Sequence, residues 1–304
     1  MNTVTIIGSI NLDTNLRVER MVRPGETIHA KEHYSAAGGK GANQAMAAAR
    51  CGTRTNFIGA VGNDLPGKQM LNLLKDEGIN ISGIQTIKDE STGQAFITVD
   101  DVGQNSITLY SGANYDFTVD DVAQNADLIN SSDFVLAQFE TPLAATLRGF
   151  QIAHEKGIKT ILNPAPAIKE IPQELLEVTD MITPNETEAE TITGVHVTDL
   201  ASAKQAADKL HALGVSAVII TIGAKGAFYD FAGQSALVPA YKVKAVDTTA
   251  AGDTFIGAMV SQLKPDFSNL KAAINFANKA SSLTVQSYGA QPSIPYKKEV
   301  EQIK

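Results

Sequence analysis

The sequence predicts an α/β fold, a mainly parallel β-sheet with helices on both faces and a small β-sheet lid. Three observations support this prediction. Short apolar runs alternate with longer runs of helical periodicity along most of the chain, as in repeated β-α-β units. The apolar runs contain few polar residues, which is typical of strands buried on both faces. Two segments in the N-terminal third interrupt the alternation and have the pattern of short paired strands.

The repeated strand–helix pairs can be followed in order along the chain. We expect strands at residues 3–9, 56–62, 134–139, 160–164 and 217–223. Helices are expected at residues 41–52, 67–78, 142–156 and 203–213, where apolar residues recur at helical spacing. Gly52 closes the first of these helices, at a position where glycine commonly ends a helix.

Two segments are expected to form the small sheet. Residues 16–34 alternate between polar and apolar side chains without a helical face, and residues 94–110 have the pattern of a hairpin that turns at 101–105. Together they predict a small antiparallel sheet over one end of the main sheet, with lid strands from about 14–35 and 94–111. The alternative to a lid is an extension of the sheet edge without a role in binding.

Composition limits the function classes. The chain has 304 residues, 43% of them hydrophobic, and no linker or repeat divides it, so we expect one domain over residues 1–304. A formal net charge of −8 argues against nucleic-acid binding but not against a small phosphorylated ligand. No apolar run approaches the ~20 residues that span a bilayer, and no signal peptide is expected. The single Cys51 is typical of a reducing compartment, so we expect a cytoplasmic protein.

One motif is misleading. Residues 62–69, G-N-D-L-P-G-K-Q, have the spacing of a phosphate-binding P-loop, but Gln69 replaces the Ser or Thr that would bind Mg²⁺. Pro66 removes an N–H group and Asp64 adds a negative charge. We interpret the segment as a turn that enters a helix, with Pro66 near its first position. No G-x-G-x-x-G follows the first strand, so a nicotinamide-dependent oxidoreductase has no support.

Polar residues follow the expected strands. Asn11 and Asp13 come after the first strand, and because they are two apart on an extended chain, they face the same way. Such a pair can bind several hydroxyl groups, which indicates a sugar or polyol; an Asx turn is the alternative. Glu140 follows another strand and is either a further contact or an acid that favours the next helix N-terminus.

A glycine-rich stretch, G-G-K-G-A-N-Q at residues 38–44, precedes the first helix. Its glycines permit a close backbone approach to a ligand, and the helix start offers free N–H groups. Lys40 adds a cation and Asn43 an amide. A flexible turn is the alternative, but it would not need this combination. We therefore favour a ligand site formed by Gly38, Gly39, Lys40, Gly41 and Asn43.

Two later strand ends carry candidate nucleotide contacts. Asn185 and Glu188 are three apart and adjacent on a helix face, where they could hold a metal-bound water and a phosphate oxygen. A helix N-terminus rich in acids is the alternative. The glycines of T-I-G-A-K-G at 221–226 permit a turn with N–H groups facing a nucleotide, or a plain β-hairpin. Asn278 lies on an apolar helix and either contacts an adenine or faces solvent.

The stretch D-T-T-A-A-G-D, residues 247–253, places an acid on each side of five small residues before a helix expected to begin near Thr254. With the helix dipole behind them, several backbone N–H groups can form an anion hole, those of Ala250, Ala251, Gly252 and Asp253. Such a hole suits phosphoryl transfer, since the transferred group is negatively charged. Asp253 can accept the proton of an attacking hydroxyl; an ordinary N-cap is the alternative.

The motifs together resemble a known family. D-T-T-A-A-G-D-T-F is similar to the C-terminal signature of the ribokinase-like carbohydrate kinases, and G-G-K-G-A-N-Q to their N-terminal signature. G-S-I-N-L-D, T-P-N-E-T-E-A-E and G-A-Q-P-S (289–293) resemble further motifs of these kinases and occur in the expected order. The resemblance spans essentially the whole chain. Ala250 stands where many members of the wider superfamily carry glycine.

The resemblance implies a role for each matched residue. Asp253 would be the catalytic base, and the sugar would be held by Asn11, Asp13, Gly39, Lys40, Asn43 and Glu140. The ATP site would be lined by Asn185, Thr221, Ile222, Gly223, Ala224, Lys225, Gly226, Gly252 and Asn278. Glu188 would act on Mg²⁺ through water. A monovalent cation, K⁺, would be surrounded by Asp247, Thr249, Thr284, Ser287, Gly289 and Ser293.

The resemblance also implies an activity and an assembly. The expected reaction is ATP-dependent phosphorylation of D-ribose at its 5-hydroxyl, with Mg²⁺ and K⁺ as cofactors and a homodimer formed through the lid. A kinase for 2-deoxyribose, fructose or a nucleoside is the first alternative. A sugar-binding regulator without catalysis is the second, although Asp253 and the complete loop argue against it.

Overall fold

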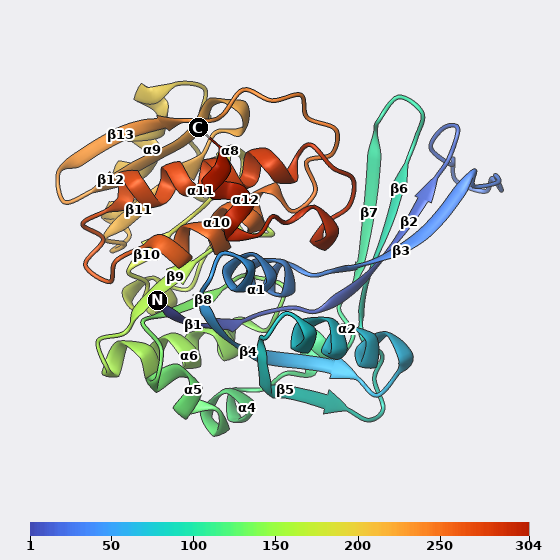
Figure 1. Cartoon of the computed structure of the whole chain (residues 1–304), viewed down its shortest axis with the longest axis horizontal. Helices are drawn as coiled ribbons and strands as arrows, with labels where there is room; N and C mark the ends of the chain where they lie inside the picture. The colour runs from blue at the N-terminus through green and yellow to red at the C-terminus, as the bar shows by residue number, and fades with distance from the viewer. Residues whose placement is uncertain (304) are drawn as a thin grey trace.

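The computed structural model describes residues 1–303 and contains a nine-stranded sheet at its centre (Figure 1). In spatial order its strands are β13 (Gln234–Pro239), β12 (Gly226–Phe231), β11 (Ala217–Thr221), β10 (Met181–Ile182), β9 (Lys159–Leu162), β8 (Phe134–Ala137), β1 (Thr3–Ile7), β4 (Arg54–Gly62) and β5 (Asn80–Ile87). Every neighbouring pair from β5 to β11 is parallel, and only the pairs β11–β12 and β12–β13 are antiparallel. The predicted mainly parallel sheet is confirmed.

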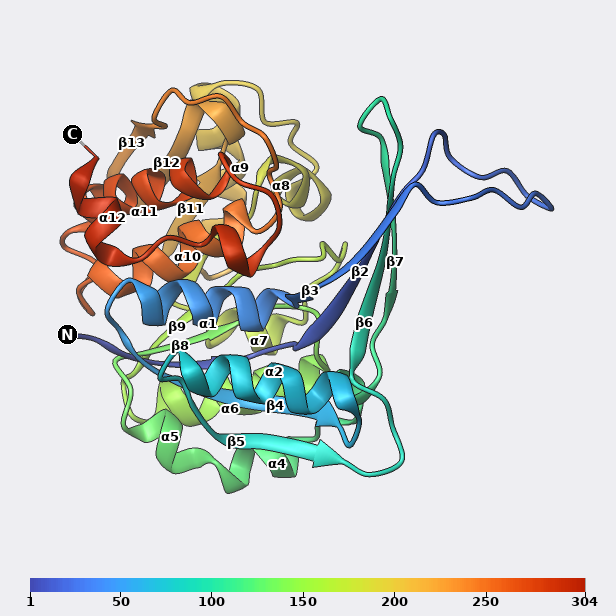
Figure 2. The ribbon, with the colours of Figure 1, turned by 45° about the vertical axis from the view of Figure 1, so that its right-hand side comes forward.

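Helices cover both faces of this sheet (Figures 1 and 2). One layer contains α1 (Lys40–Arg50), α2 (Leu65–Asp76), α10 (Ala251–Gln262), α11 (Leu270–Thr284) and α12 (Lys297–Gln302). The other contains α3 (Ala113–Asp116), α4 (Val119–Gln124), α5 (Ala126–Asn130), α6 (Leu143–Glu155), α7 (Gln173–Glu177), α8 (Glu186–Thr193) and α9 (Leu200–Ala212). Successive residues of β8 alternate between the two cores, Phe134 and Leu136 in one and Val135 and Ala137 in the other. This explains why the strands are apolar without interruption.

A second sheet of four strands projects from the carboxyl ends of the strands of the main sheet (Figure 2). Its order is β3 (Glu32–Gly38), β2 (Asn11–Arg17), β6 (Gly93–Val99) and β7 (Asn105–Tyr110). The predicted small second sheet, which we call the lid, is confirmed. Its two outer pairs are antiparallel as expected, but its central pair β2–β6 is parallel. Both strands leave parallel strands of the main sheet, β1 and β5, and so extend in the same direction. The lid also begins earlier than expected and includes Asn11 and Asp13.

Several local expectations can be compared with the structure. The P-loop-like segment is a turn into α2, where the side chain of Asp64 caps the helix by accepting a hydrogen bond from the Gly67 amide at 2.8 Å. The segment 221–226 is a β-hairpin, β11–β12, joined by a 3₁₀ turn, η1 (Gly223–Lys225). A second 3₁₀ turn, η2 (Gln291–Ser293), precedes α12. Within residues 1–303, none of the helices combines the length and the apolar character that a membrane crossing requires.

Candidate active site

The candidate site lies where α1 and α10 begin, beside the carboxyl ends of the central parallel strands. An inner cavity of about 200 Å³ opens there, lined by Lys40, Asn163, Ala165, Thr183, Asn185, Glu188, Thr221, Thr248, Ala250, Ala251, Gly252, Asp253 and Ile256. Ligands of open α/β sheets bind at this end of the strands. The fold therefore brings together candidate residues that are more than 200 positions apart in the sequence.

Asp253 lies in the first turn of α10 and is buried. Its Oδ2 accepts a hydrogen bond from Asn43 Nδ2 at 3.1 Å, and its Oδ1 accepts one from Gln44 Nε2 at 2.9 Å. The alternative interpretation as an N-cap is wrong, because Ala250 occupies that position. Two amides from α1 thus fix the carboxylate, and each oxygen keeps a lone pair for another donor.

The loop before α10 leaves backbone amides free, although fewer than predicted. Ala250 adopts a left-handed conformation with φ of 59°, which is the conformation that glycine would favour at this position. The Ala251 amide donates to the Thr248 carbonyl at 3.2 Å, so it is used inside the turn. Among residues 1–303, no acceptor is found for the amides of Ala250, Gly252 and Asp253. Because the first amides of a helix lack intrahelical acceptors, they can bind an anion.

Asn11 and Asp13 share one face of β2, as predicted, and both are buried. Burial, together with the negative charges of Glu140 and Asp253, raises the pKa of Asp13 to about 7. Asp13 Oδ1 and Asn43 Oδ1 are buried and have no hydrogen-bond partner within residues 1–303. Two buried acceptors without donors are uncommon in folded proteins, so the site is prepared for a ligand with hydroxyl groups.

Glu140 completes the same region. Its Oε2 accepts hydrogen bonds from Ser9 Oγ at 2.5 Å and from the Lys40 amide at 3.0 Å. It therefore binds the N-terminus of α1 rather than that of the next helix, α6. Burial favours the neutral form of Lys40, but the charges of Asp253, Glu140 and Glu188 outweigh this effect and raise the pKa of the lysine. Lys40 is a cation held among carboxylates beside the inner cavity.

The glycines of the stretch 38–41 also have a packing role that was not predicted. A Cβ atom on Gly39 would lie 2.8 Å from the Asn11 amide nitrogen, and one on Gly41 would lie 2.6 Å from that of Ser9. A Cβ atom on Gly38 would collide with the Asp13 carboxylate. Gly39 also has φ of 89°. These glycines therefore allow α1 to pack against the turn between β1 and β2, which brings Lys40 and Asn43 to the site.

An outer cavity of about 480 Å³ adjoins the inner one and shares Asn185, Thr221, Thr248, Ala251 and Gly252 with it. Gly223, Ala224, Gly226 and Asn278 line it with residues 240–243, Ala245 and one face of α11. Asn278 is buried, so the alternative that it faces solvent is wrong; its Nδ2 donates to the carbonyls of Val238 and Pro239. Two expected residues do not line it, since Ile222 is buried and the Lys225 ammonium donates to the Thr198 carbonyl.

Asn185 and Glu188 form a capping box at the start of α8. The Asn185 amide donates to Glu188 Oε2 at 2.9 Å, and the Glu188 amide donates to Asn185 Oδ1 at 2.8 Å. The alternative of a helix N-terminus rich in acids thus fits the local structure, where Glu186 and Glu188 lie in the first turn, but Asn185 and Glu188 also line the inner cavity. Burial raises the pKa of Glu188 more than the hydrogen bond from Asn185 lowers it. Within residues 1–303, no group of three or more acids, histidines or cysteines could hold a metal ion alone.

The expected cation residues lie on two segments that pack side by side. Asp247 Oδ1 accepts a hydrogen bond from the Thr249 amide, and its Oδ2 accepts one from the Gly289 amide, both at 2.9 Å. These bonds and that from the Thr249 hydroxyl outweigh burial and lower the pKa of Asp247. Thr284 is fully buried, and its hydroxyl donates to Thr254 Oγ1 at 3.1 Å. The Ser287 amide bonds to the Thr284 carbonyl, and the Ser293 hydroxyl to that of Ala290.

The lid covers one side of the site. A small recess of about 60 Å³ is lined by Asn11, Glu140 and the lid residues Leu109 and Tyr110, among others. Asn114, which the sequence analysis did not select, lies in the same recess and is buried. Its Nδ2 donates to Asn11 Oδ1 at 2.8 Å, so the Asn11 amide group points its own N–H bonds elsewhere. Its place in the short helix α3, after the sequence S-G-A, belongs to no motif that would indicate this contact.

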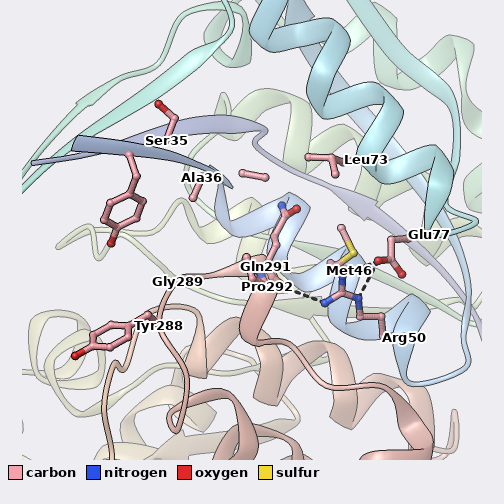
Figure 3. Close-up of a pocket in the computed structure, with 12 residues that line it drawn as sticks. Ser35, Ala36, Met46, Arg50, Leu73, Glu77, Tyr288, Gly289, Gln291 and Pro292 are labelled. Atoms are coloured by element: carbon pink, nitrogen blue, oxygen red, sulfur yellow. Dashed lines mark hydrogen bonds and ion pairs between the residues drawn. The ribbon is translucent and has the colours of Figure 1, made fainter. Parts of the chain in front are cut away.

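A separate cavity of about 450 Å³ lies behind the lid, between β3, α1, α2 and η2 (Figure 3). Arg50 points into it toward Glu77, with Nη2 and Oε1 2.6 Å apart. The guanidinium also donates to the carbonyls of Gln291 and Ile294. The charges of Arg50 and Glu77 are thus paired with each other, whereas the candidate base Asp253 and the free amides of α10 line the inner cavity. We therefore take the inner cavity as the active site.

Comparison with known proteins agrees with this geometry. The model of the pfkB family carbohydrate kinases matches residues 1–297. The chain belongs to this family. The kinase is 50% identical over 303 residues to the ribokinase of Staphylococcus aureus, and the match covers 99% of both chains. The resemblance inferred from the motifs is confirmed.

Two further relatives are informative. The kinase is 48% identical to the bifunctional ribokinase/ribose-5-phosphate isomerase A of Fructilactobacillus sanfranciscensis, but spans only 56% of the length of that protein. Among solved structures, Arabidopsis thaliana ribokinase complexed with ribose and ATP superposes with a TM-score of 0.90 at 33% identity, covering 99% of this chain and 98% of the other. The predicted fold class is confirmed by this similarity.

Proposed function

We propose that the kinase transfers the γ-phosphoryl group of ATP to the 5-hydroxyl of D-ribose. The observation that carries the proposal is the position of Asp253. It lines the inner cavity, where its carboxylate contacts Asn43 and lies next to the free amides at the start of α10. The similar proteins named ribokinase support ribose as the acceptor, and the Arabidopsis enzyme was solved with ribose and ATP. Both substrates are small molecules.

In the proposed reaction, the hydroxyl oxygen of the sugar forms a bond to the γ-phosphorus of ATP. The bond between the γ-phosphorus and the bridging oxygen breaks, and that oxygen leaves with ADP. The hydroxyl proton passes to Asp253. A carboxylate is a weak base, but the hydroxyl becomes acidic as its oxygen bonds to phosphorus. The free amides of Gly252 and Asp253 and the Lys40 ammonium stabilise the negative charge of the transferred group. The lid excludes water, which would otherwise accept the phosphoryl group.

The sugar would satisfy the unpaired acceptors. A ribose hydroxyl donates to Asp13 Oδ1 and another to Asn43 Oδ1, the two buried atoms without donors. Because Asn11 Oδ1 is occupied by Asn114, the Asn11 Nδ2 donates to a sugar oxygen. A sugar that lacks one of these hydroxyls leaves a buried acceptor unpaired, which costs about 1–3 kcal/mol. This arrangement favours ribose over 2-deoxyribose.

ATP would occupy the outer cavity, with its phosphates reaching the inner one through the shared residues Asn185, Thr221 and Gly252. Mg²⁺ bound to nucleotide phosphates keeps several waters, which suits a site with few carboxylates. Glu188 lines the inner cavity and would hold such a water. When bound, the ion neutralises phosphate charge; the residues of the chain orient the nucleotide and the hydroxyl.

A monovalent cation, K⁺, is proposed at the loop of Asp247. Segments 246–249 and 284–293 are joined by hydrogen bonds from the Val246 amide to the Val285 carbonyl at 2.7 Å and from Gly289 to Asp247. A cation bound by oxygens of these segments would fix the loop that presents the amides of α10. Its role would be indirect, through the conformation of residues 247–251.

A coupled assay of ADP release tests the proposal. The purified kinase is supplied with ATP, Mg²⁺ and one acceptor: D-ribose, 2-deoxyribose, fructose or a nucleoside. We expect the highest kcat/KM with ribose and a value for 2-deoxyribose lower by about 10-fold or more. The series is repeated with K⁺ replaced by tetramethylammonium, which should lower turnover. No ribose-dependent ADP release would contradict the function, and equal rates in both salts would contradict the cation site alone.

A homodimer through the lid is also proposed. The lid carries exposed apolar side chains on both of its faces, Phe96 on one and Ile107 and Leu109 on the other. Exposed apolar patches of this kind mark interaction sites. We expect a mass of twice 32.2 kDa in sedimentation equilibrium. The double variant Phe96→Glu and Ile107→Glu should sediment as a monomer, whereas Val102→Glu at the tip serves as a matched control. A parent protein that sediments as a monomer would overturn this assembly.

A further inference from the structure

Behind the candidate base lies a chain of buried amide side chains that the proposed reaction does not use directly. Gln44 comes from α1, Asn163 follows β9 and Gln138 follows β8. Gln44 and Gln138 are fully buried. Gln44 Nε2 donates to Asp253 Oδ1 at 2.9 Å and to Asn163 Oδ1 at 3.0 Å, while Gln138 Nε2 donates to Gln44 Oε1 at 2.6 Å.

The two ends of this chain fix the orientation of every amide in it. Asn163 donates its Nδ2 to the Thr183 carbonyl at 3.1 Å, so its Oδ1 must face Gln44. The Asp253 carboxylate also accepts from Gln44, which therefore presents Nε2 to both. Its Oε1 is left to face Gln138, and only the Nε2 of Gln138 can donate to it. Reversing any one amide would place two donors or two acceptors together.

The last member of the chain is incompletely satisfied. Gln138 Oε1 is buried and has no hydrogen-bond partner within residues 1–303. Gln138 fits only because Gly8 has no side chain, since a Cβ atom there would collide with the Gln138 oxygen. A half-satisfied buried amide is a poor source of stability, and an apolar side chain of similar size is often neutral or better. Stability therefore does not account for Gln138.

We infer that Gln44 and Gln138 are positioning residues for the base, an inference that rests on the proposed function. Gln44 holds the Asp253 carboxylate at the angle that directs its free lone pair to the sugar hydroxyl. Gln138 does not line the inner cavity and acts only through Gln44, by holding the Oε1 end of its amide in place. Without that hydrogen bond, the Gln44 amide can tilt, and its hydrogen bond no longer holds the Asp253 carboxylate at one angle.

The discriminating variant is Gln138→Met, which keeps the volume and removes the amide. We expect kcat to fall about 10-fold, because small misplacements of reacting groups slow the reaction by factors of this order or more. KM for ribose should stay within about 2-fold, and Tm should be unchanged or higher, since an unpaired buried oxygen is removed. A merely structural residue would show the opposite pattern, a lower Tm with an unchanged kcat.

Thr146→Val provides the matched control. Thr146 on α6 is also buried with an unpaired hydroxyl, but it belongs to the opposite layer of helices. Its replacement should leave kcat and KM unchanged. A fall in kcat in this variant similar to that of Gln138→Met would mean that any change in the core slows the enzyme, and would overturn the inference.

Gln138→Glu supplies a second readout. A protonated carboxyl can donate to Gln44 Oε1, whereas the ionised form can only accept and would repel that oxygen, which displaces the amide that holds Asp253. We expect kcat of this variant to fall more steeply with rising pH than kcat of the parent. If the pH profiles of kcat for Gln138→Glu and the parent are parallel, and Gln138→Met keeps a parent-like kcat, Gln138 does not position the base and the inference is overturned. The function is tested separately: if Asp253→Asn keeps parent-like turnover, the assigned base is wrong, whatever Gln138 does.

Discussion

Asp253→Asn is expected to lower kcat with ribose and ATP by about 10²–10⁴-fold, the usual contribution of a positioned general base. The asparagine amide cannot accept the hydroxyl proton. It also disturbs the local hydrogen bonds, because Asn43 and Gln44 both donate to residue 253. One of them would face the new NH₂ group, so the variant should lose about 1–3 kcal/mol of stability without unfolding.

The measurement combines steady-state kinetics with calorimetric titration of ribose. Ribose binding should persist, since Asn11 and Asp13 remain in place on β2. The near-ultraviolet circular dichroism spectrum of the variant should match that of the parent. A kcat within 10-fold of the parent, in a variant that binds ribose normally, would exclude Asp253 as the base and leave the amides of α10 as the main source of catalysis.

The sequence predicted the site at the level of motifs because chemistry and spacing both lie in short segments there. The loop 247–253 contains two acids and small residues at a helix start, and in the structure Thr248 and residues 250–253 line the inner cavity. It could not predict that α10 begins at Ala251 or that the Ala251 amide bonds to the Thr248 carbonyl. The first residue of a helix depends on the geometry of the preceding turn, and the conformation of a single residue, here Ala250, can change that geometry.

Other features depend on contacts between distant segments. The glycines at 38, 39 and 41 were recognised as unusual, but the reason for them, the close packing of α1 on the turn at residues 8–11, is tertiary. Asn114 and Gln138 belong to no motif. Their roles can be inferred only from their hydrogen bonds to Asn11 and Gln44, which are distant in sequence.

The same limit applies to the sheet. β10 has two residues, too few to show a period, and its place between β9 and β11 is set by its neighbours. The parallel pairing of β2 with β6 likewise depends on the directions of β1 and β5. By contrast, the long apolar strands and amphipathic helices were predicted correctly, because burial on both faces leaves a local pattern.

Asp13→Asn is expected to have opposite effects on activity and stability. Its carboxylate accepts from a ribose hydroxyl in the proposed complex, and hydrogen bonds to a charged group contribute about 1.5–3 kcal/mol. At pH 8 we therefore expect kcat/KM for ribose to fall roughly 10- to 200-fold, mainly through KM. The discrimination against 2-deoxyribose should weaken in the variant if the hydroxyl that it lacks is the one that binds Asp13.

The stability effect follows from the pKa of Asp13, which burial and the nearby carboxylates raise from 3.8 to about 7. Below pH ~4 the group is protonated in both the folded and the unfolded chain, and folding carries no penalty. Between about pH 4 and pH 7 the unfolded chain ionises while the folded one stays protonated, so the free energy of unfolding falls as pH rises. Above pH ~7 the free energy of unfolding falls no further. The total decrease is up to about 4 kcal/mol for a shift of about three pKa units.

Asparagine at position 13 carries no such penalty. The free energy of unfolding, measured by urea titration at pH 4, 6 and 8 without ribose, should therefore favour the variant increasingly as pH rises. Ribose should reduce this difference, because its hydroxyl donates to the ionised carboxylate of the parent. Curves that run parallel from pH 4 to pH 8 would mean that Asp13 ionises normally in the folded protein. In this scheme the ionised Asp13 carboxylate lowers the stability of the free enzyme, and only bound sugar offsets that cost. This pattern is expected of a residue that binds substrate and not of one that stabilises the fold.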